Sequence, residues 1–161
     1  MVIASLVSAA RATSGETVTY RIDHVTDGDT LVLRNGQRIR LVQIDTPEVY
    51  FGNECYGRAA SRVTKRLLPP GARVRLYAEP ATRIDDYGRL LRYVRAKDGV
   101  NANIALVAVG AAAPYFYKGR RGEYASRLEI LAKSAKAKHL GLWGACPRTK
   151  YDPDHGVETR R

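Results

Sequence analysis

No apolar run in the sequence approaches the roughly 20 residues that a helix needs to cross a bilayer, so we expect no integral membrane protein. The sequence also lacks internal repeats and low-complexity linkers. Its 161 residues, 45% of them hydrophobic, suffice for one domain with a buried core and do not fit a disordered or fibrous protein.

Cysteine and histidine, the usual ligands of zinc, are scarce: the chain has two cysteines and three histidines. Cys55 and Cys146 lie far apart in the sequence with no ligand-spaced histidine near them, so they form no local zinc motif. Two alternatives stay open for them, a disulfide or two reduced structural thiols. If the protein is exported, a disulfide that closes so long a loop would stabilise it by about 4 to 5 kcal/mol.

Acidic residues are outnumbered, with 16 Asp and Glu against 27 Lys and Arg, which gives a formal net charge of +11. This charge favours a polyanionic partner, and nucleic acid is the commonest one. Binding of that kind gains affinity by releasing counterions from phosphates, so it should weaken steeply with added salt. The alternative is a soluble basic domain whose charges are merely solvated.

The two ends of the chain differ from its middle. An apolar stretch, Val2 to Ala10, ends in Ala10-Arg11-Ala12, which resembles a signal-peptide cleavage site although no Lys or Arg precedes it. We interpret residues 1–16 as a signal-peptide remnant and expect a secreted or cell-envelope protein, with the cytoplasm as the alternative. Residues 17–147 form the predicted domain, and the polar tail 148–161 is expected to be disordered.

Short strands dominate the first hundred residues. Alternation through Val18, Tyr20 and Ile22 predicts a strand with one buried face. The pair Asn35-Gly36 is a strong signal of a two-residue hairpin. The five predicted strands are Thr17 to Val25, Thr30 to Arg34, Gln37 to Ile44, Arg73 to Ala78 and Arg89 to Arg95.

Three segments predict helices. Arg58 to Leu68 is rich in helix formers and stops at two prolines and a glycine. Ile104 to Val109 follows Asn103, a good N-cap. The third helix lies between Gly122 and His139, where apolar residues repeat at helical spacing. Five strands and three helices predict an α+β domain built on a small Greek-key barrel, an architecture suited to binding oligonucleotides.

A cluster of acids with one arginine stands out against the basic background. Asp27-Gly28-Asp29-Thr30 is followed by Arg40 and then by Ile44-Asp45-Thr46-Pro47-Glu48. Carboxylates can hold a divalent cation, and a guanidinium can grip a phosphate. These are the ingredients of a metal-assisted phosphodiester cleavage site.

Six motifs follow one another along the chain: Asp27-Gly28-Asp29-Thr30, Arg40-Leu41, Asp45-Thr46-Pro47-Glu48, Tyr56-Gly57, Asp85-Asp86-Tyr87-Gly88-Arg89 and Leu142-Trp143. The individual motifs are common, but the ordered set at these intervals is specific. With this set the chain resembles the staphylococcal nuclease (thermonuclease) family from about Thr17 to Cys146. The resemblance implies an OB-type barrel of five strands that carries three helices.

The resemblance implies a calcium ion bound by the Asp29 and Asp45 carboxylates and the Thr46 backbone carbonyl, and hard oxygen donors of this kind suit Ca²⁺. Asp27 would support the site without ligating the ion, and an Asx-type turn is its simplest structural role. Glu48 would be the general base or would orient the attacking water.

The resemblance assigns Arg40 and Arg89 to the scissile phosphate, where a planar guanidinium offers paired donors that lysine cannot reproduce. It places Tyr115 and Tyr117 beside the nucleotide, where stacking tolerates any base. Lys118 extends the basic surface toward backbone phosphates.

Together these residues predict a calcium-dependent endonuclease that cleaves DNA and RNA with little sequence specificity and leaves 3′-phosphate ends. We expect a monomer that needs no protein partner and no membrane. Two alternatives remain: a non-catalytic nucleic-acid or protein-binding module of the same family, and a secreted basic protein that binds an anionic surface.

Two departures from the family pattern concern substrate binding. The segment from Val49 to Glu54 is short where the best-known member has a longer, lysine-rich loop. Asp86 is an acid where that member has a basic residue. Both are expected to alter the grip on the nucleic acid.

Overall fold

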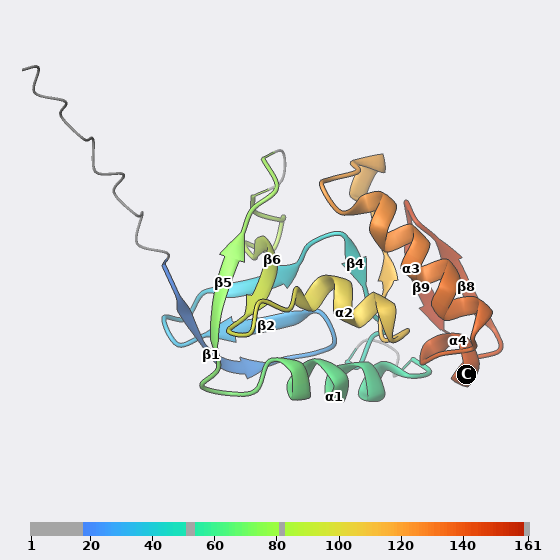
Figure 1. Cartoon of the computed structure of the whole chain (residues 1–161), viewed down its shortest axis with the longest axis horizontal. Helices are drawn as coiled ribbons and strands as arrows, with labels where there is room; N and C mark the ends of the chain where they lie inside the picture. Colours follow the sequence, from blue (N-terminus) through green and yellow to red (C-terminus); the bar gives the residue numbers. More distant parts are fainter. Residues whose placement is uncertain (1–17, 51–53, 81–82, 160–161) are drawn as a thin grey trace, which may run out of the picture.

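The computed structural model describes residues 18–50, 54–80 and 83–159, which form a closed five-stranded barrel with helices packed around it (Figure 1). The strands follow the order β1-β2-β3-β6-β5; β3 and β6 are parallel, and the other neighbours are antiparallel. The predicted α+β barrel is therefore confirmed. The barrel strands are β1 (Tyr20–Val25), β2 (Thr30–Leu33), β3 (Arg38–Leu41), β5 (Arg73–Tyr77) and β6 (Leu90–Ala96).

The barrel interior is built from the alternating apolar residues of its strands. Ile22, Leu31 and Ile39 are fully buried there, because successive side chains of a strand point to opposite faces. Val18, which we predicted on the buried face, is 65% exposed and precedes the first strand. The chain thus enters the barrel at Tyr20.

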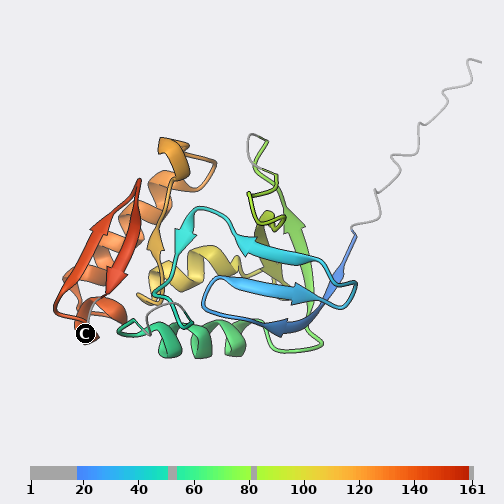
Figure 2. The ribbon, with the colours of Figure 1, turned by 180° about the vertical axis from the view of Figure 1, so that it is seen from behind.

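The three predicted helices are present as α1 (Gly57–Leu67), α2 (Ala102–Ala108) and α3 (Ala125–Ala137), and a short fourth helix, α4 (Leu142–Ala145), was not predicted. Figures 1 and 2 show α1 beneath the barrel and α3 on the side of the C-terminal strands. The N-cap of α2 is Asn101, whose side chain accepts from the Ile104 N–H at 3.3 Å. The predicted cap, Asn103, is instead buried and donates to the Val42 carbonyl at 2.8 Å.

The predicted strand Gln37 to Ile44 is divided in two. Gln43 adopts a φ of 62°, a left-handed conformation that breaks the extended chain. The chain therefore leaves the barrel after β3, and β4 (Ile44–Asp45) pairs with β7 (Ala113–Pro114) in a separate two-stranded sheet. This break places Asp45 beside the segment that carries Tyr115.

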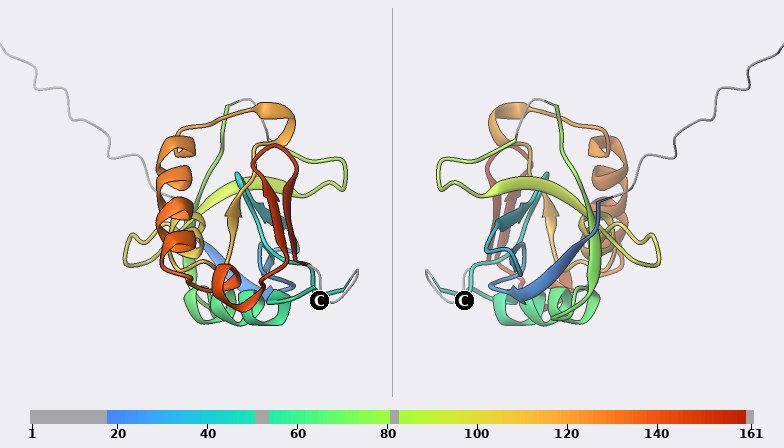
Figure 3. Two further views of the ribbon diagram at one scale, coloured as in Figure 1. Left: turned by 90° about the vertical axis from the view of Figure 1, so that its right-hand side faces the viewer. Right: turned by 90° about the vertical axis from the view of Figure 1, so that its left-hand side faces the viewer.

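Within the C-terminal tail, where disorder was expected, residues 148–159 are ordered. They form a hairpin of β8 (Thr149–Asp152) and β9 (Gly156–Thr159), which lies beside β4 and β7 (Figure 3). Val157 packs in a small apolar cluster with Ala113 and Leu142. The tail is polar on average, but this buried residue and its hydrogen bonds to the domain order it. The signal-peptide interpretation concerns residues outside the described part of the chain.

A disulfide joins Cys55 to Cys146 across 91 residues. It links the segment that precedes α1 to the end of α4, next to the start of the C-terminal hairpin. Cys55 also binds the hairpin directly: its N–H donates to the Thr159 carbonyl at 3.0 Å, and its carbonyl accepts from the Thr159 hydroxyl at 2.6 Å. The cross-link and these hydrogen bonds attach the hairpin to the domain.

Reduction of the disulfide should lower the free energy of unfolding by about 4 to 5 kcal/mol, because it releases a long closed loop in the unfolded chain. Urea unfolding with and without a thiol reductant measures the difference. The double variant Cys55→Ser/Cys146→Ser is the control, and its stability should match that of the reduced protein in either buffer. Equal midpoints for the oxidised and reduced protein would contradict this expectation.

Candidate active site

The turn between β1 and β2 holds the first two acids of the sequence cluster. The Asp29 N–H donates to the Asp27 carboxylate at 3.1 Å, so Asp27 closes an Asx-type turn. Gly28 lies between them, and a Cβ at this position would stand 2.4 Å from the Thr46 hydroxyl. Only glycine lets this turn approach Thr46 so closely.

Asp29 is the centre of the hydrogen-bond network. Its side chain is buried, and Oδ2 accepts from both the N–H and the hydroxyl of Thr46 at 3.1 Å. Its other oxygen, Oδ1, accepts from the Thr30 hydroxyl at 3.1 Å. The barrel turn is thereby tied to the segment that follows β4.

Arg40, in β3, joins Asp29 to Asp45. Nη2 lies 3.0 Å from an oxygen of each carboxylate, and Nη1 donates to the carbonyls of Leu41 and Ile44 at 2.8 and 2.7 Å. Burial alone would lower the pKa of Arg40, but Asp29 and Asp45 outweigh it and raise the pKa. The guanidinium therefore stays charged and bridges an acid of the β1–β2 turn and an acid of β4.

Glu48 lies on the loop after β4, and the start of α1 supports its backbone. A Cβ on Gly57 would lie 2.5 Å from the Glu48 carbonyl oxygen, so this packing also requires glycine. The Glu48 N–H donates to Glu54 Oε2 at 2.9 Å, and the Glu54 N–H donates back to the Glu48 carbonyl at 3.0 Å. Residues 51–53 of the short loop lie outside the described segments.

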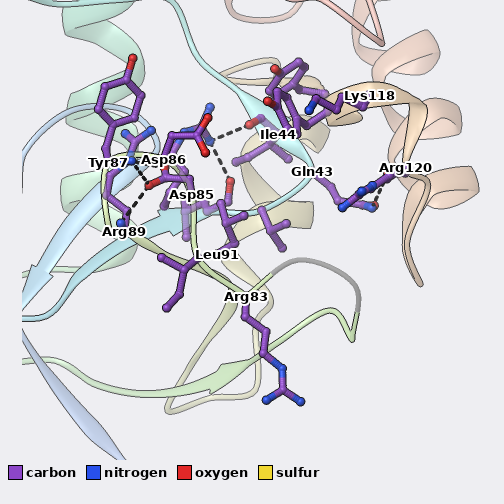
Figure 4. A pocket seen from close by; sticks show the side chains of 16 residues that line it. Gln43, Ile44, Arg83, Asp85, Asp86, Tyr87, Arg89, Leu91, Lys118 and Arg120 are labelled. Atoms are coloured by element: carbon purple, nitrogen blue, oxygen red, sulfur yellow. Dashed lines mark hydrogen bonds and ion pairs between the residues drawn. The ribbon is translucent and has the colours of Figure 1, made fainter.

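Arg89, which directly precedes β6, contacts Asp85 and Thr30. Its Nε donates to Asp85 Oδ2 at 2.7 Å, and its Nη1 contacts the Thr30 hydroxyl at 3.2 Å. Because that hydroxyl donates to Asp29, one carboxylate connects to both arginines, to Arg40 directly and to Arg89 through Thr30. Figure 4 shows Asp85 holding the Arg89 side chain.

Both arginines line a cavity of about 420 Å³ together with Tyr115, Tyr117 and Lys118 (Figure 4). Tyr117 and Lys118 belong to η1 (Tyr117–Gly119), a single 3₁₀ turn. The two tyrosine rings meet edge-on with centroids 6.4 Å apart, and Lys118 Nζ stands 5.2 Å from the Tyr117 ring. Asp86 also lines this cavity. The structure thus brings the predicted phosphate-binding and base-binding residues to one pocket.

Three acids of the cluster have raised pKa values. Burial, and next the charge of Asp29, raises the pKa of Asp27 to about 6. Burial raises the pKa of Asp45 to about 6 against the opposing effect of Arg40, and Asp29 adds to the rise. Burial, followed by the charges of Asp29 and Asp27, raises the pKa of Glu48 to about 7. One arginine does not balance the negative charge of these acids.

This charge excess is the property that a divalent cation would neutralise. The predicted ligands, two carboxylates and the Thr46 carbonyl, are hard oxygen donors and fit an ion such as calcium. No group of three or more His, Cys, Asp or Glu residues suited to holding a metal occurs within residues 18–50, 54–80 and 83–159. A cation here would therefore depend on carbonyl and water oxygens as well as on Asp29 and Asp45.

Sequence reasoning missed three contributors to the site. Thr30 was part of the quoted motif but was given no role, and Asp85, four residues before Arg89, was not recognised as its partner. The third is Val157 of the C-terminal hairpin, whose N–H donates to Asp45 at 3.0 Å. Nothing in the local sequence at Val157 indicates that contact.

No helix in the described segments is long and apolar enough to span a membrane.

The Cys55–Cys146 pair lies at the base of the C-terminal hairpin, and no cysteine enters the acid cluster.

Comparison with known proteins places the chain in a family. The family model described as "Staphylococcal nuclease homologue" matches residues 38–145. Thermonuclease of Staphylococcus intermedius is 38% identical over 130 residues, covering 77% of this chain and 75% of that protein. Endonuclease YncB of Bacillus subtilis is 33% identical over 132 residues, covering 78% of this chain and 62% of that protein.

The SPbeta prophage-derived endonuclease YokF of Bacillus subtilis is 33% identical over 147 residues, which are 88% of this chain and 48% of that protein. The chain thus spans less than two thirds of each Bacillus relative. The matched region includes Arg40, Asp45, Glu48 and Arg89, whereas Asp27 and Asp29 precede it. The chain therefore belongs to the staphylococcal nuclease homologue family.

Proposed function

We propose that this chain is a calcium-dependent endonuclease that hydrolyses phosphodiester bonds of DNA and RNA without sequence specificity and leaves 3′-phosphate ends. The main support for this proposal is that the Asp29 carboxylate connects to both Arg40 and Arg89. The predicted ion site and the predicted phosphate-binding arginines therefore belong to one network. The names of three relatives, one a thermonuclease and two endonucleases, support the same reaction class.

Asp29, Asp45 and the Thr46 carbonyl are the proposed calcium ligands, and Asp27 would hold the turn that presents Asp29. When bound, the ion would supply Lewis-acid polarisation of the phosphoryl oxygens. The chain itself fixes the ligands: Thr46 holds Asp29 through two hydrogen bonds, and Arg40 holds Asp45.

Glu48 would accept a proton from the attacking water or hold that water in line. In the ion-free protein, partial burial and the charges of Asp29 and Asp27 raise the pKa of Glu48, which makes its carboxylate a stronger proton acceptor. The water oxygen would form a bond to phosphorus while the bond from phosphorus to the 5′-oxygen breaks. That oxygen takes up a proton, and the products are a 5′-hydroxyl and a 3′-phosphate.

Arg40 and Arg89 would bind the nonbridging phosphate oxygens and stabilise the charge that grows on them in the transition state. In this structure Arg40 donates three hydrogen bonds and forms an ion pair with Asp29, so turning its guanidinium toward a phosphate would give up some of these contacts. Arg89 is held by Asp85 through Nε. Its guanidinium is therefore oriented before substrate arrives.

The pocket beside the arginines suits a nucleotide of any sequence. Tyr115 and Tyr117 can stack on a base, and Lys118 can reach a backbone phosphate. The net charge of +11 would attract either nucleic acid, and single-stranded regions fit a stacking pocket best. Asp86, in the same pocket, should weaken the grip on the phosphate end.

The disulfide supports export to an oxidising compartment, so we propose a secreted or cell-envelope enzyme that acts as a monomer. The second candidate is a non-catalytic binding module, which would use the same basic pocket without bond cleavage. The link from Asp29 to both arginines favours the enzyme, because binding nucleic acid does not require a buried carboxylate among the cations that would hold the phosphate.

The proposed reaction is tested by incubating purified protein with single- and double-stranded DNA and RNA in calcium or in chelator. We expect cleavage of all four substrates in calcium, faster for single strands, and none in chelator. End-group analysis should find 3′-phosphates and 5′-hydroxyls. Intact substrate in calcium would refute the enzyme, whereas 5′-phosphate products would keep a nuclease and refute the bond assignment.

Conservative variants separate the enzyme from the binding module. Glu48→Gln removes the proton acceptor and Arg89→Lys removes the guanidinium fork, so each should lower the cleavage rate by at least about 10² to 10⁴-fold. Glu129→Gln and Arg127→Lys, at exposed positions of α3, are matched controls that should cleave at the wild-type rate. A cleavage rate unchanged in Glu48→Gln and Arg89→Lys would exclude the assigned roles.

Calcium should stabilise the folded protein, since the ion binds a site that the unfolded chain lacks. At about 100 times its Kd it would add about 2.7 kcal/mol, or roughly 5 to 10 °C in the thermal midpoint. Asp45→Asn should abolish this shift, and Asp98→Asn, in an exposed turn, should keep it. A midpoint of the wild type that does not respond to calcium would contradict the proposed ion site.

A further inference from the structure

The C-terminal hairpin reaches into the acid cluster. The Val157 N–H donates to Asp45 Oδ2 at 3.0 Å, a contact between residues 112 positions apart. The other oxygen of Asp45 lies 3.0 Å from Arg40 Nη2. The carboxylate is thus held from two sides, by a barrel arginine and by the backbone of β9.

Gly156 brings the hairpin backbone into contact with Asp45. A Cβ built on Gly156 would stand 2.6 Å from Asp45 Oδ2 and 3.3 Å from its Cγ. Gly156 also has a φ of +93°, in the left-handed region that favours glycine. A side chain here would both strain the turn and displace the carboxylate.

Separate contacts fix the hairpin at both ends. At its open end, Thr159 exchanges two hydrogen bonds with Cys55, and the Cys55–Cys146 disulfide lies beside them. At its tip, the Pro153 carbonyl accepts from the Phe116 N–H at 2.7 Å. The Val157 N–H is therefore a donor in a fixed place.

We propose that the hairpin β8–β9 is a positioning element of the cation site, in which Gly156 and the Val157 N–H set the orientation of the Asp45 carboxylate. This inference rests on the proposed function, because it assigns the hairpin to the ion that Asp45 is proposed to bind. A hydrogen bond to a charged carboxylate is about twice as strong as a neutral one. Groups that orient a metal ligand in this way contribute about 10- to 100-fold in metal affinity.

The matched pair Gly156→Ala and Gly99→Ala tests the contact with Asp45. Gly99 has a φ of +88°, close to that of Gly156, but nothing lies within 4 Å of a Cβ built there. Both variants therefore carry similar backbone strain, and only one adds a methyl group against Asp45. Calorimetric titration of the metal-free protein with calcium should give about 10- to 100-fold weaker binding for Gly156→Ala and wild-type affinity for Gly99→Ala.

A second pair isolates the hydrogen bond. Val157→Pro removes the N–H that Asp45 accepts, and Val157→Ala trims the side chain but keeps the N–H. Calcium affinity should fall for Val157→Pro and stay at the wild-type value for Val157→Ala. Val157→Ala also loses apolar packing and should be less stable than the wild type. If the hairpin has a merely structural role, calcium affinity should therefore fall in both variants, in step with their loss of thermal stability.

The outcomes separate this inference from the proposed function. Wild-type protein that binds calcium and cleaves nucleic acid, with unchanged calcium affinity in Gly156→Ala and Val157→Pro, would overturn the role of the hairpin alone. Wild-type protein that does not bind calcium would overturn both. If Gly156→Ala does not fold, the comparison of the two Val157 variants decides.

Discussion

One guanidinium organises the site of this protein. Arg40 forms ion pairs with two carboxylates and donates to two backbone carbonyls, and it does so while almost wholly buried. The acids around it come from the β1–β2 turn and from β4, which no local sequence preference would bring together. Leaving such charges unpaired in the interior would cost several kcal/mol, so the bridge and its acids depend on one another. Burial, together with the remaining negative charge, raises the pKa values of Asp27, Asp45 and Glu48, and this excess of negative charge is what a cation would neutralise.

The backbone around this bridge is placed by close packing. Gly28 lets the β1–β2 turn touch Thr46, and Gly57 lets α1 press against the Glu48 carbonyl. The Thr64 hydroxyl of α1 donates to the Gly28 carbonyl at 2.6 Å, so the helix beneath the barrel supports the same turn. A rigid scaffold of this kind holds acids and arginines in one geometry, which phosphodiester chemistry requires because its barrier is lowered by positioning and charge.

The parts of the fold that local patterns encode were predictable. Alternation at Ile22 and the helix formers after Gly57 indicated β1 and α1, and the spaced motifs indicated which residues meet at the site. The break at Gln43 was not predictable, because a non-glycine residue adopts the left-handed conformation there only in its tertiary context. The same holds for the C-terminal hairpin: its sequence is polar, and its order comes from Cys55, Phe116 and Asp45, which are distant in the sequence.

The central claim is that Arg40 and Arg89, joined through Asp29, act on one phosphate as a unit. A double-mutant cycle on the single-turnover cleavage rate, with Arg40→Lys, Arg89→Lys and the double variant, measures this coupling directly. If both guanidiniums serve the same transition state through Asp29, the double variant should be little slower than the slower single variant. If the fold losses in rate of the two single variants multiply in the double variant, the two arginines contribute independently, which would contradict the account of a single network.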